Sequence, residues 1–257
     1  MDTKEIYNAM LSAEREGAKL ILHAHDVMTE EKTGHRDIVT AYDKKVQELL
    51  VARLSAAVPG AKFFCEENDV QDDLRAEHVF VIDPIDGTMN FVKGYCHSCT
   101  SIGYLHEGVM TAAAIYNPYL DEMFSAIRGE GAWLNGKPIH AAETPLSDNI
   151  FALGSSPYQP ELADETFRLA RLAFDASLDL RRGAAAALDL AYIAAGRVGL
   201  FFEQTLGFWD YAAGLLLVQE AGGVCTRLDG SPLPLDGSKP SVLAGGRQAY
   251  ADFRKLL

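Results

Sequence analysis

The sequence predicts a layered α+β protein made of two subdomains. In the first half, two helical patterns precede a run of short strand patterns separated by turn residues, which is typical of an antiparallel sheet. In the second half, strand and helix patterns alternate, which is typical of α/β layering. With 257 residues, of which 48% are hydrophobic and 23% charged, the chain can bury one large core or two smaller ones.

Two amphipathic helices are expected at the N-terminus. In each of them apolar or small residues recur at steps of three and four, so that they line one face. The predicted helices cover residues 2–28 and 40–57, and Asp2 with Glu5 suits a capped start of the first. Between the helices, the polar segment 29–37 has loop composition, and we expect it to be mobile.

Short strands and turns are expected after the second helix. Asn135-Gly136 is a strong tight-turn signal, so residues 132–139 are predicted to form a hairpin. The stretch 141–149 has loop composition and no apolar period, and it separates the predicted subdomains 1–144 and 145–257. The other predicted strands of the first subdomain, which turn signals separate, cover residues 63–65, 98–106, 109–116 and 123–127.

The second subdomain is predicted to alternate strands with helices. Arg181-Arg182 is interpreted as a basic turn between two helices. The predicted strands cover residues 150–153, 198–202 and 241–244, and the predicted helices cover residues 160–176, 184–196 and 209–221, before a short terminal helix.

The stretch 81–91, VIDPIDGTMNF, gives the strongest chemical signal. Its β-branched Val-Ile pair suits a buried strand that ends at Asp83, because the proline that follows disfavours helical backbone before it. Asp86 and Gly87 come next, and Thr88 is expected to cap a helix. Carboxylates and carbonyl oxygens bind hard cations such as Mg²⁺, and the free N–H groups of a helix start bind phosphate. The combination indicates metal-assisted phosphoryl chemistry.

Composition and charge exclude several classes of protein. The net charge of −13 argues against nucleic acid as a partner, because duplex binding depends on clustered Lys and Arg. It also looks unfavourable for an anionic substrate, but bound divalent cations invert the local field. No apolar run is long enough for a membrane span. The polar N-terminus is unlike a signal peptide and four cysteines are too few for a disulfide framework, so we expect a cytoplasmic protein.

Four motifs follow one another in a characteristic order along nearly the whole chain. They are Cys-Glu-Glu at 65–67, DPIDGTMNF at 83–91, GEGAWLNG at 129–136 and WDYAAGLLLVQEAGG at 209–223. A lone Asp-x-x-Asp would be weak, but this ordered set is specific. The chain resembles the inositol monophosphatase family of metal-dependent, lithium-sensitive sugar phosphatases. The resemblance implies an αβαβα sandwich of the inositol monophosphatase and fructose-1,6-bisphosphatase type, and a homodimer.

The resemblance implies two or three Mg²⁺ ions in the active site. Glu66, Asp83 and the main-chain carbonyl of Ile85 would hold one ion, and Asp83, Asp86 and Asp210 would hold a second. Hard cations prefer such oxygen ligands, and two of them can hold both ends of an in-line displacement. Taken one at a time, the same acids suit a capped turn, a surface position or a helix start.

Catalytic roles are implied for Thr88, Asp43 and Glu66. Thr88 and Asp43 would form a hydrogen-bonded pair that orients the attacking water. From the sequence alone, Asp43 is also explained as a charge that the dipole of the second predicted helix favours.

The resemblance also implies how the substrate is held. The N–H groups of Gly87 and Thr88 would hold the phosphate. Lys32 matches a lysine that approaches the metal and phosphate region, although a solvated lysine is also common in such a loop. Glu203, six residues before Trp209, matches an acid that contacts a sugar hydroxyl. The complete set of expected substrate-binding residues is Lys32, Asp86, Gly87, Thr88, Ala185, Ala186, Glu203 and Asp210.

The sequence departs from the family's pattern in two places. In the run GAAAALDL, Ala184 and Ala185 stand where the family usually has Gly and then Ser or Thr, and Gly183 comes one place early. This departure affects the backbone that contacts the sugar, and therefore the substrate. Cys65 replaces a residue that is usually Gly or another small residue, which is a milder change.

The segment Cys96-His97-Ser98-Cys99 also resembles a redox or zinc motif. If it forms a strand, thiols three residues apart point to opposite faces, so a structural role is favoured. Phe91, Tyr95 and Tyr104 are expected in the core rather than in contact with a ligand.

The resulting expectation is an Mg²⁺-dependent phosphomonoesterase that hydrolyses inositol monophosphate or a similar polyol phosphate without a covalent enzyme intermediate. One alternative keeps the fold but changes the substrate, to 3′-phosphoadenosine 5′-phosphate, fructose 1,6-bisphosphate or histidinol phosphate. Another is a non-catalytic metal-binding or regulatory protein that keeps the scaffold.

Overall fold

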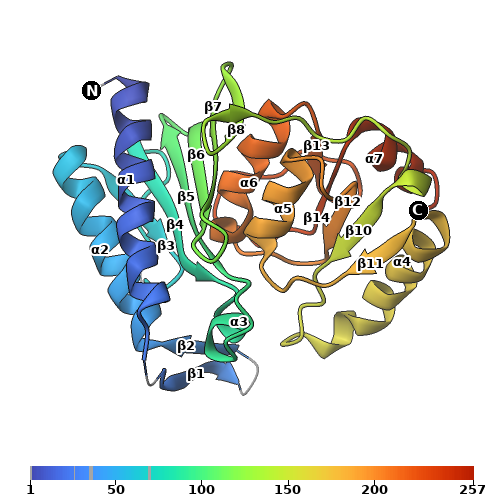
Figure 1. Cartoon of the computed structure of the whole chain (residues 1–257), viewed down its shortest axis with the longest axis horizontal. Helices are drawn as coiled ribbons and strands as arrows, with labels where there is room; N and C mark the ends of the chain where they lie inside the picture. The colour runs from blue at the N-terminus through green and yellow to red at the C-terminus, as the bar shows by residue number, and fades with distance from the viewer. Residues whose placement is uncertain (1, 26, 35–36, 69–70) are drawn as a thin grey trace.

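The computed structural model describes residues 2–25, 27–34, 37–68 and 71–257. Helices and sheets alternate in five layers (Figure 1), so the predicted αβαβα sandwich is confirmed. One helix pair covers the outer face of a seven-stranded sheet, a second lies between the two sheets, and a third covers a five-stranded sheet. In that order the pairs are α1 (Thr3–Leu22) with α2 (Ala41–Ala57), α5 (Ala186–Ala194) with α6 (Phe208–Glu220), and α4 (Ala163–Ala176) with α7 (Arg247–Arg254).

The larger sheet has the strand order β3-β4-β5-β6-β7-β8-β9. β3 and β4 are parallel, and each later pair is antiparallel, which confirms the predicted antiparallel strands and the hairpin. Helices cover both faces of its centre, which explains why β4 and β5 are buried along almost their whole length. The strands are β3 (Lys62–Cys65), β4 (His78–Asp86), β5 (Cys99–His106), β6 (Val109–Asn117), β7 (Glu122–Ile127), β8 (Gly131–Leu134) and β9 (Lys137–Pro138).

The smaller sheet has the strand order β11-β10-β12-β14-β13. β10 is parallel to both of its neighbours, and β14 is antiparallel to both of its own. Two of its strands were not predicted, because three residues are too few to show a period. The strands are β10 (Ile150–Leu153), β11 (Asp179–Arg181), β12 (Leu200–Glu203), β13 (Val224–Thr226) and β14 (Val242–Gly245). The predicted boundary at 144/145 falls between the two sheets, and the division into subdomains stays a prediction.

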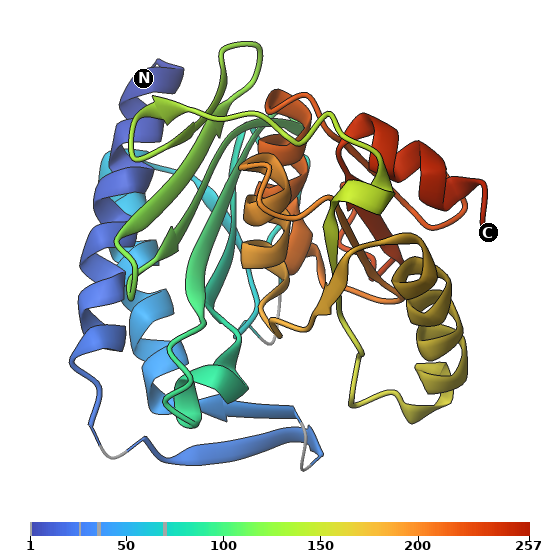
Figure 2. The same ribbon diagram turned by 45° about the vertical axis from the view of Figure 1, so that its right-hand side comes forward.

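A two-stranded ribbon replaces the predicted loop between the first two helices. β1 (Thr29–Gly34) pairs with β2 (Asp37–Thr40), and Figure 2 shows the ribbon passing below α3 (Thr88–Val92). Most of its residues are polar, so no apolar alternation indicates a strand. α1 also ends at Leu22, before the predicted end at residue 28. Residues 35 and 36 of the predicted loop lie outside the described residues, and its mobility stays a prediction.

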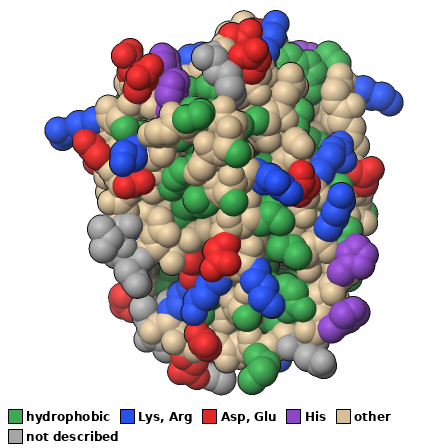
Figure 3. Space-filling view, turned by 90° about the vertical axis from the view of Figure 1, so that its left-hand side faces the viewer, with side chains coloured by type: hydrophobic (Ala, Val, Ile, Leu, Met, Phe, Trp, Pro, Cys, Tyr) green, Lys and Arg blue, Asp and Glu red, His purple; other side chains and the backbone are tan. Residues whose placement is uncertain are grey.

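The start of α1 is capped as predicted. The N–H of Glu5 donates to Asp2 Oδ1 at 2.8 Å, and the N–H of Asp2 donates to Glu5 Oε2 at 3.0 Å. On the outer side of the molecule, where α1 and α2 lie, acidic and basic side chains are interspersed (Figure 3). Arg53 of α2 forms an ion pair with Glu16 of α1 at 2.7 Å. Within the described part of the chain, no helix is both long and apolar enough to cross a membrane.

Phe91 and Tyr104 are buried, as predicted. Tyr95 is 68% exposed, so its predicted place in the core is wrong. It follows the short helix α3 in an irregular connection to β5, where no apolar period constrains its direction.

The two central helices are buried almost all round because a sheet covers each side. They pack closely at Gly214 of α6, where an added Cβ would lie 2.5 Å from Leu190 Cδ1 and 2.6 Å from Leu190 Cβ on α5. The close packing of α5 against α6 therefore requires a glycine at position 214.

Gly214→Ala should lower the free energy of unfolding by about 1–3 kcal/mol, because the new methyl group overlaps a Cβ that cannot rotate away. Gly17→Ala in α1 is the matched control. Its Cβ would meet only the ends of two flexible side chains, the nearer being Leu50 Cδ2 at 3.1 Å. The higher helix propensity of Ala should keep this variant near or above wild-type stability. Urea denaturation of both variants tests the prediction, and equal losses would contradict it.

Candidate active site

The acidic end of β4 is shaped by a β-bulge. Asp83 lies opposite Ser101 of β5, but Asp86 lies opposite Cys99, so the register slips between the two acids. β4 thus continues to Asp86, past the predicted end at Asp83, because a bulge accommodates a proline that cannot donate to the ladder. The N–H of Ile85 donates to Asp83 Oδ1 at 3.0 Å. Bulges redirect side chains next to active sites, and this one brings two acids of one strand together.

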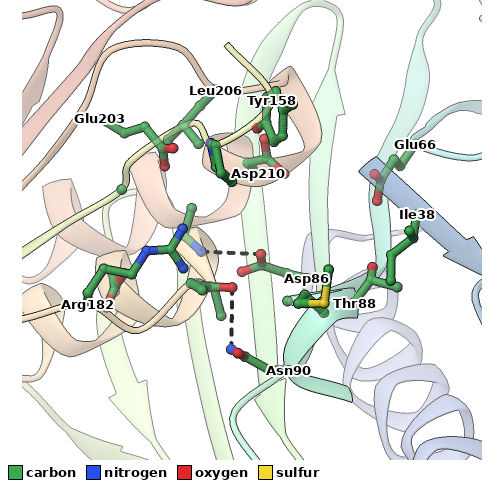
Figure 4. Close-up of a pocket in the computed structure, with 18 residues that line it drawn as sticks. Ile38, Glu66, Asp86, Thr88, Asn90, Tyr158, Arg182, Glu203, Leu206 and Asp210 are labelled. Carbon is green, nitrogen blue, oxygen red and sulfur yellow. Dashed lines mark hydrogen bonds between the residues drawn. The ribbon is translucent and has the colours of Figure 1, made fainter. Parts of the chain in front are cut away.

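Asp210 joins these two acids from the start of α6. It accepts a hydrogen bond from the N–H of Gly207 at 2.7 Å, which fixes its direction. Asp83, Asp86 and Asp210 each offer an oxygen, and these oxygens all lie within 4.8 Å of one another. The close-up in Figure 4 shows Asp86 and Asp210 pointing into one cavity. Such a set of carboxylate oxygens suits a hard divalent cation.

The pKa values of the clustered acids also indicate that the site suits a divalent cation. Burial raises the pKa of Asp83 and Asp210 well above the usual range, and the neighbouring carboxylates raise it further. Burial also raises the pKa of Asp86, to about 6, against the hydrogen bonds from Ala186 and Ala187. Because like charges this close disfavour ionisation, a bound cation would offset the repulsion.

Glu66 approaches the triad from the end of β3, and its charge raises the pKa of Asp83. Lys32 lies against it: Lys32 Nζ donates to Glu66 Oε1 at 3.0 Å and to Glu67 Oε1 at 2.5 Å. Burial lowers the pKa of Lys32, but the two acids outweigh this effect and raise it. Burial, with the charge of Glu66, raises the pKa of Glu67 to about 7. Lys32 is thus placed by the β1-β2 ribbon rather than by an irregular loop.

Thr88 and Asp43 are hydrogen-bonded, as the sequence predicts. Thr40 caps α2, and both its N–H and its hydroxyl donate to Asp43 Oδ2, at 2.8 and 2.5 Å. Asp43 Oδ1 is left to accept from Thr88 Oγ1 at 3.1 Å. Thr88 Oγ1 also lies 3.0 Å from the carbonyl oxygen of Ile85, and its single proton can go to only one of the two acceptors. Burial raises the pKa of Asp43, although these hydrogen bonds oppose the shift.

The prediction that Thr88 caps a helix is wrong. Gly87 is the N-cap, with a left-handed φ of 86°, and Thr88 is the first residue of the short helix α3. The hydroxyl of Thr88 is free for Asp43 because it caps no main-chain N–H. A left-handed turn favours Gly, which is why this residue stands between Asp86 and Thr88.

The alanine run meets Asp86 through the start of α5. The N–H of Ala186 donates to Asp86 Oδ1 at 3.2 Å, which a dashed line marks in Figure 4. The N–H of Ala187 donates to Asp86 Oδ2 at 2.7 Å. Ala185 and Ala186 both line the cavity, but the amide of Ala186 faces a metal-site acid rather than the open space. Ala184, which precedes them, has a left-handed φ of 62°.

Glu203 lies across the cavity from Glu66 (Figure 4). It ends β12, and Glu203 Oε1 accepts from the N–H and the hydroxyl of Ser156 at 3.0 and 2.9 Å. A Cβ on Gly154 would lie 1.8 Å from Glu203 Oε2, so this carboxylate needs a Gly beside it. The cavity has a volume of about 410 Å³, which is enough for a small ligand.

Asp189 and Arg182 also line this cavity, although the sequence gave no reason to select them. Asp189 is only 4% exposed, and no hydrogen bond or ion pair found among the described residues engages its carboxylate. Burial raises its pKa well above the usual range, and Asp86 and Glu203 raise it further, while Arg182 lowers it. In the sequence, the only feature that could have indicated Asp189 is its position as a single acid in an alanine-rich helix.

The cysteine segment is not one strand. Cys96 is exposed with a φ of 56°, and β5 begins only at Cys99, so the strand premise is wrong for Cys96. Cys99 is buried, with Sγ 3.7 Å from Asp86 Oδ2. Its thiol packs behind the acidic cluster while that of Cys96 faces solvent.

Comparison with known proteins places this architecture. The five layers are those of solved structures of the inositol monophosphatase type. The model of the inositol monophosphatase family matches residues 2–256, and the chain belongs to this family.

Relatives within the family have two kinds of name. The chain is 38% identical to an inositol-1-monophosphatase of Mesorhizobium japonicum over 82% of this chain and 79% of that protein. It is 35% identical to the Nus factor SuhB of Escherichia coli over 87% of this chain and 85% of that protein.

Solved structures agree with this assignment. The extragenic suppressor protein SuhB of Bartonella henselae has a TM-score of 0.90 at 32% identity, with 96% of each chain covered. An IMPase/NADP phosphatase complexed with Mg²⁺ and phosphate has a TM-score of 0.85 at 26% identity, covering 99% of this chain and 94% of that one.

The acidic cluster should make the metal-free protein less stable as pH rises. The folded-state pKa of Asp86 is raised from 3.8 to about 6, so the folded state holds more protons between these values and loses stability as pH rises through them. We expect the Tm in EDTA to fall by several degrees from pH 5 to pH 8. Added Mg²⁺ should raise the Tm more at pH 8 than at pH 5.

Asp210→Asn is the control variant, because it removes one of the repelling charges. Its Tm in EDTA should depend less on pH than that of the wild type, and Mg²⁺ should shift it less. A metal-free wild type that becomes more stable from pH 5 to pH 8 would contradict the proposed repulsion.

Proposed function

We propose that this chain is an Mg²⁺-dependent phosphomonoesterase that hydrolyses inositol monophosphate or a similar small polyol phosphate. The observation that supports this most is the set of three carboxylate oxygens within 4.8 Å, from Asp83, Asp86 and Asp210. Two of these acids, Asp86 and Asp210, line a cavity that Thr88 and Glu203 also line.

In this proposal Asp83, Asp86 and Asp210 hold one Mg²⁺, and Glu66, Asp83 and the carbonyl of Ile85 hold another. When bound, the cations supply positive charge that stabilises the transferring phosphoryl group and its leaving oxygen. The family resemblance also allows a third ion. The chain's own contribution is to fix Asp83, Asp86 and Asp210 by main-chain N–H groups before a cation arrives.

Thr88 and Asp43 are proposed to orient the attacking water. Asp43 Oδ2 is occupied by Thr40, so only Oδ1 is directed at Thr88. When the Thr88 proton points to Asp43, the lone pairs of Thr88 Oγ1 can accept a hydrogen bond from water. Thr88 thereby aims the oxygen of that water at the phosphorus, and Asp43 stabilises the hydroxyl in this orientation.

The remaining contacts would bind the substrate. The N–H groups of Gly87 and Thr88, with Lys32, are proposed to contact the phosphate. Glu203 would accept a hydrogen bond from a polyol hydroxyl, because its carboxylate is already fixed by Ser156. Asp189, buried and without a described partner, is a candidate for a second hydroxyl.

The proposal includes a cytoplasmic homodimer. Three of the four cysteines are buried and all four are free, which suits a reducing compartment.

Phe167 and Phe174 are exposed seven residues apart on α4, so they lie on one face of that helix. We propose that this face contacts a second copy, and light scattering would give the mass.

A second candidate function comes from the relatives named Nus factor SuhB. The chain would then act without catalysis while keeping the metal site. The same fold acting on 3′-phosphoadenosine 5′-phosphate, fructose 1,6-bisphosphate or histidinol phosphate is a further alternative. A phosphate-release screen over these compounds and inositol monophosphates separates the enzymes, and metal binding without hydrolysis of any of them would favour the non-catalytic role.

Asp83→Asn should lower kcat for inositol monophosphate by about a thousandfold or more, because Asp83 is proposed to ligate both cations and its loss removes transition-state stabilisation. Asp175→Asn, at an exposed acid paired with Arg171, is the control and should keep wild-type activity. Phosphate release across an Mg²⁺ titration measures both. Near-normal activity of Asp83→Asn would refute the metal assignment.

Glu203→Gln should raise KM for inositol monophosphate by about tenfold, because a hydrogen bond to a charged acceptor becomes a neutral one. The KM for p-nitrophenyl phosphate, which has no hydroxyl groups, should change little. Steady-state kinetics with the two substrates tests this. An equal rise in KM for both substrates would show that Glu203 supports the fold and does not bind the polyol.

A further inference from the structure

Asn90 connects three segments of the chain beside the metal site. It lies in α3, and its side-chain Nδ2 donates to the carbonyl oxygens of His97 at 2.7 Å and Gly183 at 2.8 Å, with a longer contact to Ala184 at 3.4 Å. The two N–H groups of the amide thus make two short hydrogen bonds. One goes to the connection before β5, and the other goes to the connection before α5.

The second of these connections contains the strained residue Ala184. Its φ of 62° lies in the left-handed region, which costs an L-residue about 1–2 kcal/mol and a Gly almost nothing. A residue stays in that region only where its surroundings hold it there. The amide of Asn90 contacts the carbonyl oxygens of Gly183 and Ala184, which belong to the peptide groups on either side of the Ala184 Cα, so it is placed to do this.

The direction of the chain at Ala184 determines where α5 starts. Ala185 is the N-cap, and the next two amides, of Ala186 and Ala187, donate to the two oxygens of Asp86. The fit is tight, because a Cβ on Gly87 would lie 3.1 Å from the carbonyl oxygen of Ala184 and 3.2 Å from Ala185 Cβ. Figure 4 shows one hydrogen bond that Asn90 donates to this segment and one that Asp86 accepts from it.

We propose that Asn90 is a positioning residue that holds Ala184 in its left-handed conformation and thereby keeps the amides of Ala186 and Ala187 on Asp86. The inference rests on the proposed function only in taking Asp86 as an Mg²⁺ ligand. Without Asn90, Ala184 relaxes to a negative φ, the start of α5 shifts, and Asp86 loses the hydrogen bonds that fix its carboxylate. Mg²⁺ affinity should then fall, because orienting partners behind a ligand typically contribute about tenfold or more.

A double-mutant cycle tests this directly. Asn90→Ala should weaken Mg²⁺ binding, measured by isothermal titration calorimetry, by about tenfold or more, and should lower the Tm. Adding Ala184→Gly should restore the Mg²⁺ affinity of Asn90→Ala to within about threefold of wild type, because Gly adopts the left-handed conformation without being held. If Asn90 only joined the two segments, removing the methyl group of Ala184 would not restore the Mg²⁺ affinity.

The matched control is Glu107→Gly in the Asn90→Ala background. Glu107 has a φ of 49° in the turn between β5 and β6, so this change relieves the same kind of backbone strain in another part of the chain. It should raise the Tm without restoring Mg²⁺ affinity. Rescue by Glu107→Gly equal to that by Ala184→Gly would overturn the proposal, as would an unchanged Mg²⁺ affinity in Asn90→Ala.

Ala184→Gly alone gives a test that does not depend on the folding of Asn90→Ala. Its Tm should exceed that of wild type by a few degrees, and a lower Tm would refute the strain at Ala184. If Asn90→Ala does not fold, recovery of folding in the double variant counts as the rescue, and continued failure counts against it. Failure of the proposed function is separate: a protein that hydrolyses no phosphomonoester can still show the predicted cycle of Mg²⁺ affinities.

Discussion

Repulsion among buried acids is the constraint on which the rest of the site depends. Asp83, Asp86 and Asp210 place carboxylate oxygens within 4.8 Å of one another, in surroundings that exclude most of the water that would screen them. Main-chain N–H groups fix all three acids, and they come from the bulge of β4 and from the starts of α5 and α6. These dipoles offset part of the charge, and the part that remains is what suits a divalent cation.

Small residues allow the main chain to reach the acids. α5 lies between two sheets, so side chains on all its faces must be accommodated, and its start must also come within hydrogen-bonding distance of Asp86. Gly87 and Ala185 meet where the two segments approach, with only 3.2 Å between the Cβ of Ala185 and a Cβ added to Gly87. A hydroxyl-bearing residue at 185 would need additional space at this contact. Packing and electrostatics therefore favour the same short side chains.

Much of the fold and the acids of the site could be predicted from the sequence, whereas the residues that position them could not. Apolar period and turn residues indicate helices and hairpins because these signals are local, and the ordered acidic motifs indicate the cluster through the resemblance to the family. Lys32 lies on a ribbon that has no apolar alternation. Asn90 acts on Gly183, and the link between them depends on how two distant segments pack. No local pattern indicates that Ala184 is left-handed, because Ala is uncommon in that conformation.

The residues of the site come from both predicted subdomains. Its charges and its hydrogen bonds therefore have different effects across the boundary between them. Asp83 and Asp86 precede the predicted boundary and Asp210 follows it, so their repulsion acts to separate the end of β4 from the start of α6. In the proposed enzyme a cation held by all three would oppose that separation, but only while it is bound. The hydrogen bond from Asn90 to Gly183 crosses the same boundary between neutral groups and needs no cation. It can therefore keep the segments aligned at the pH values where the charges repel most, so the acids stay arranged for the next ion to bind.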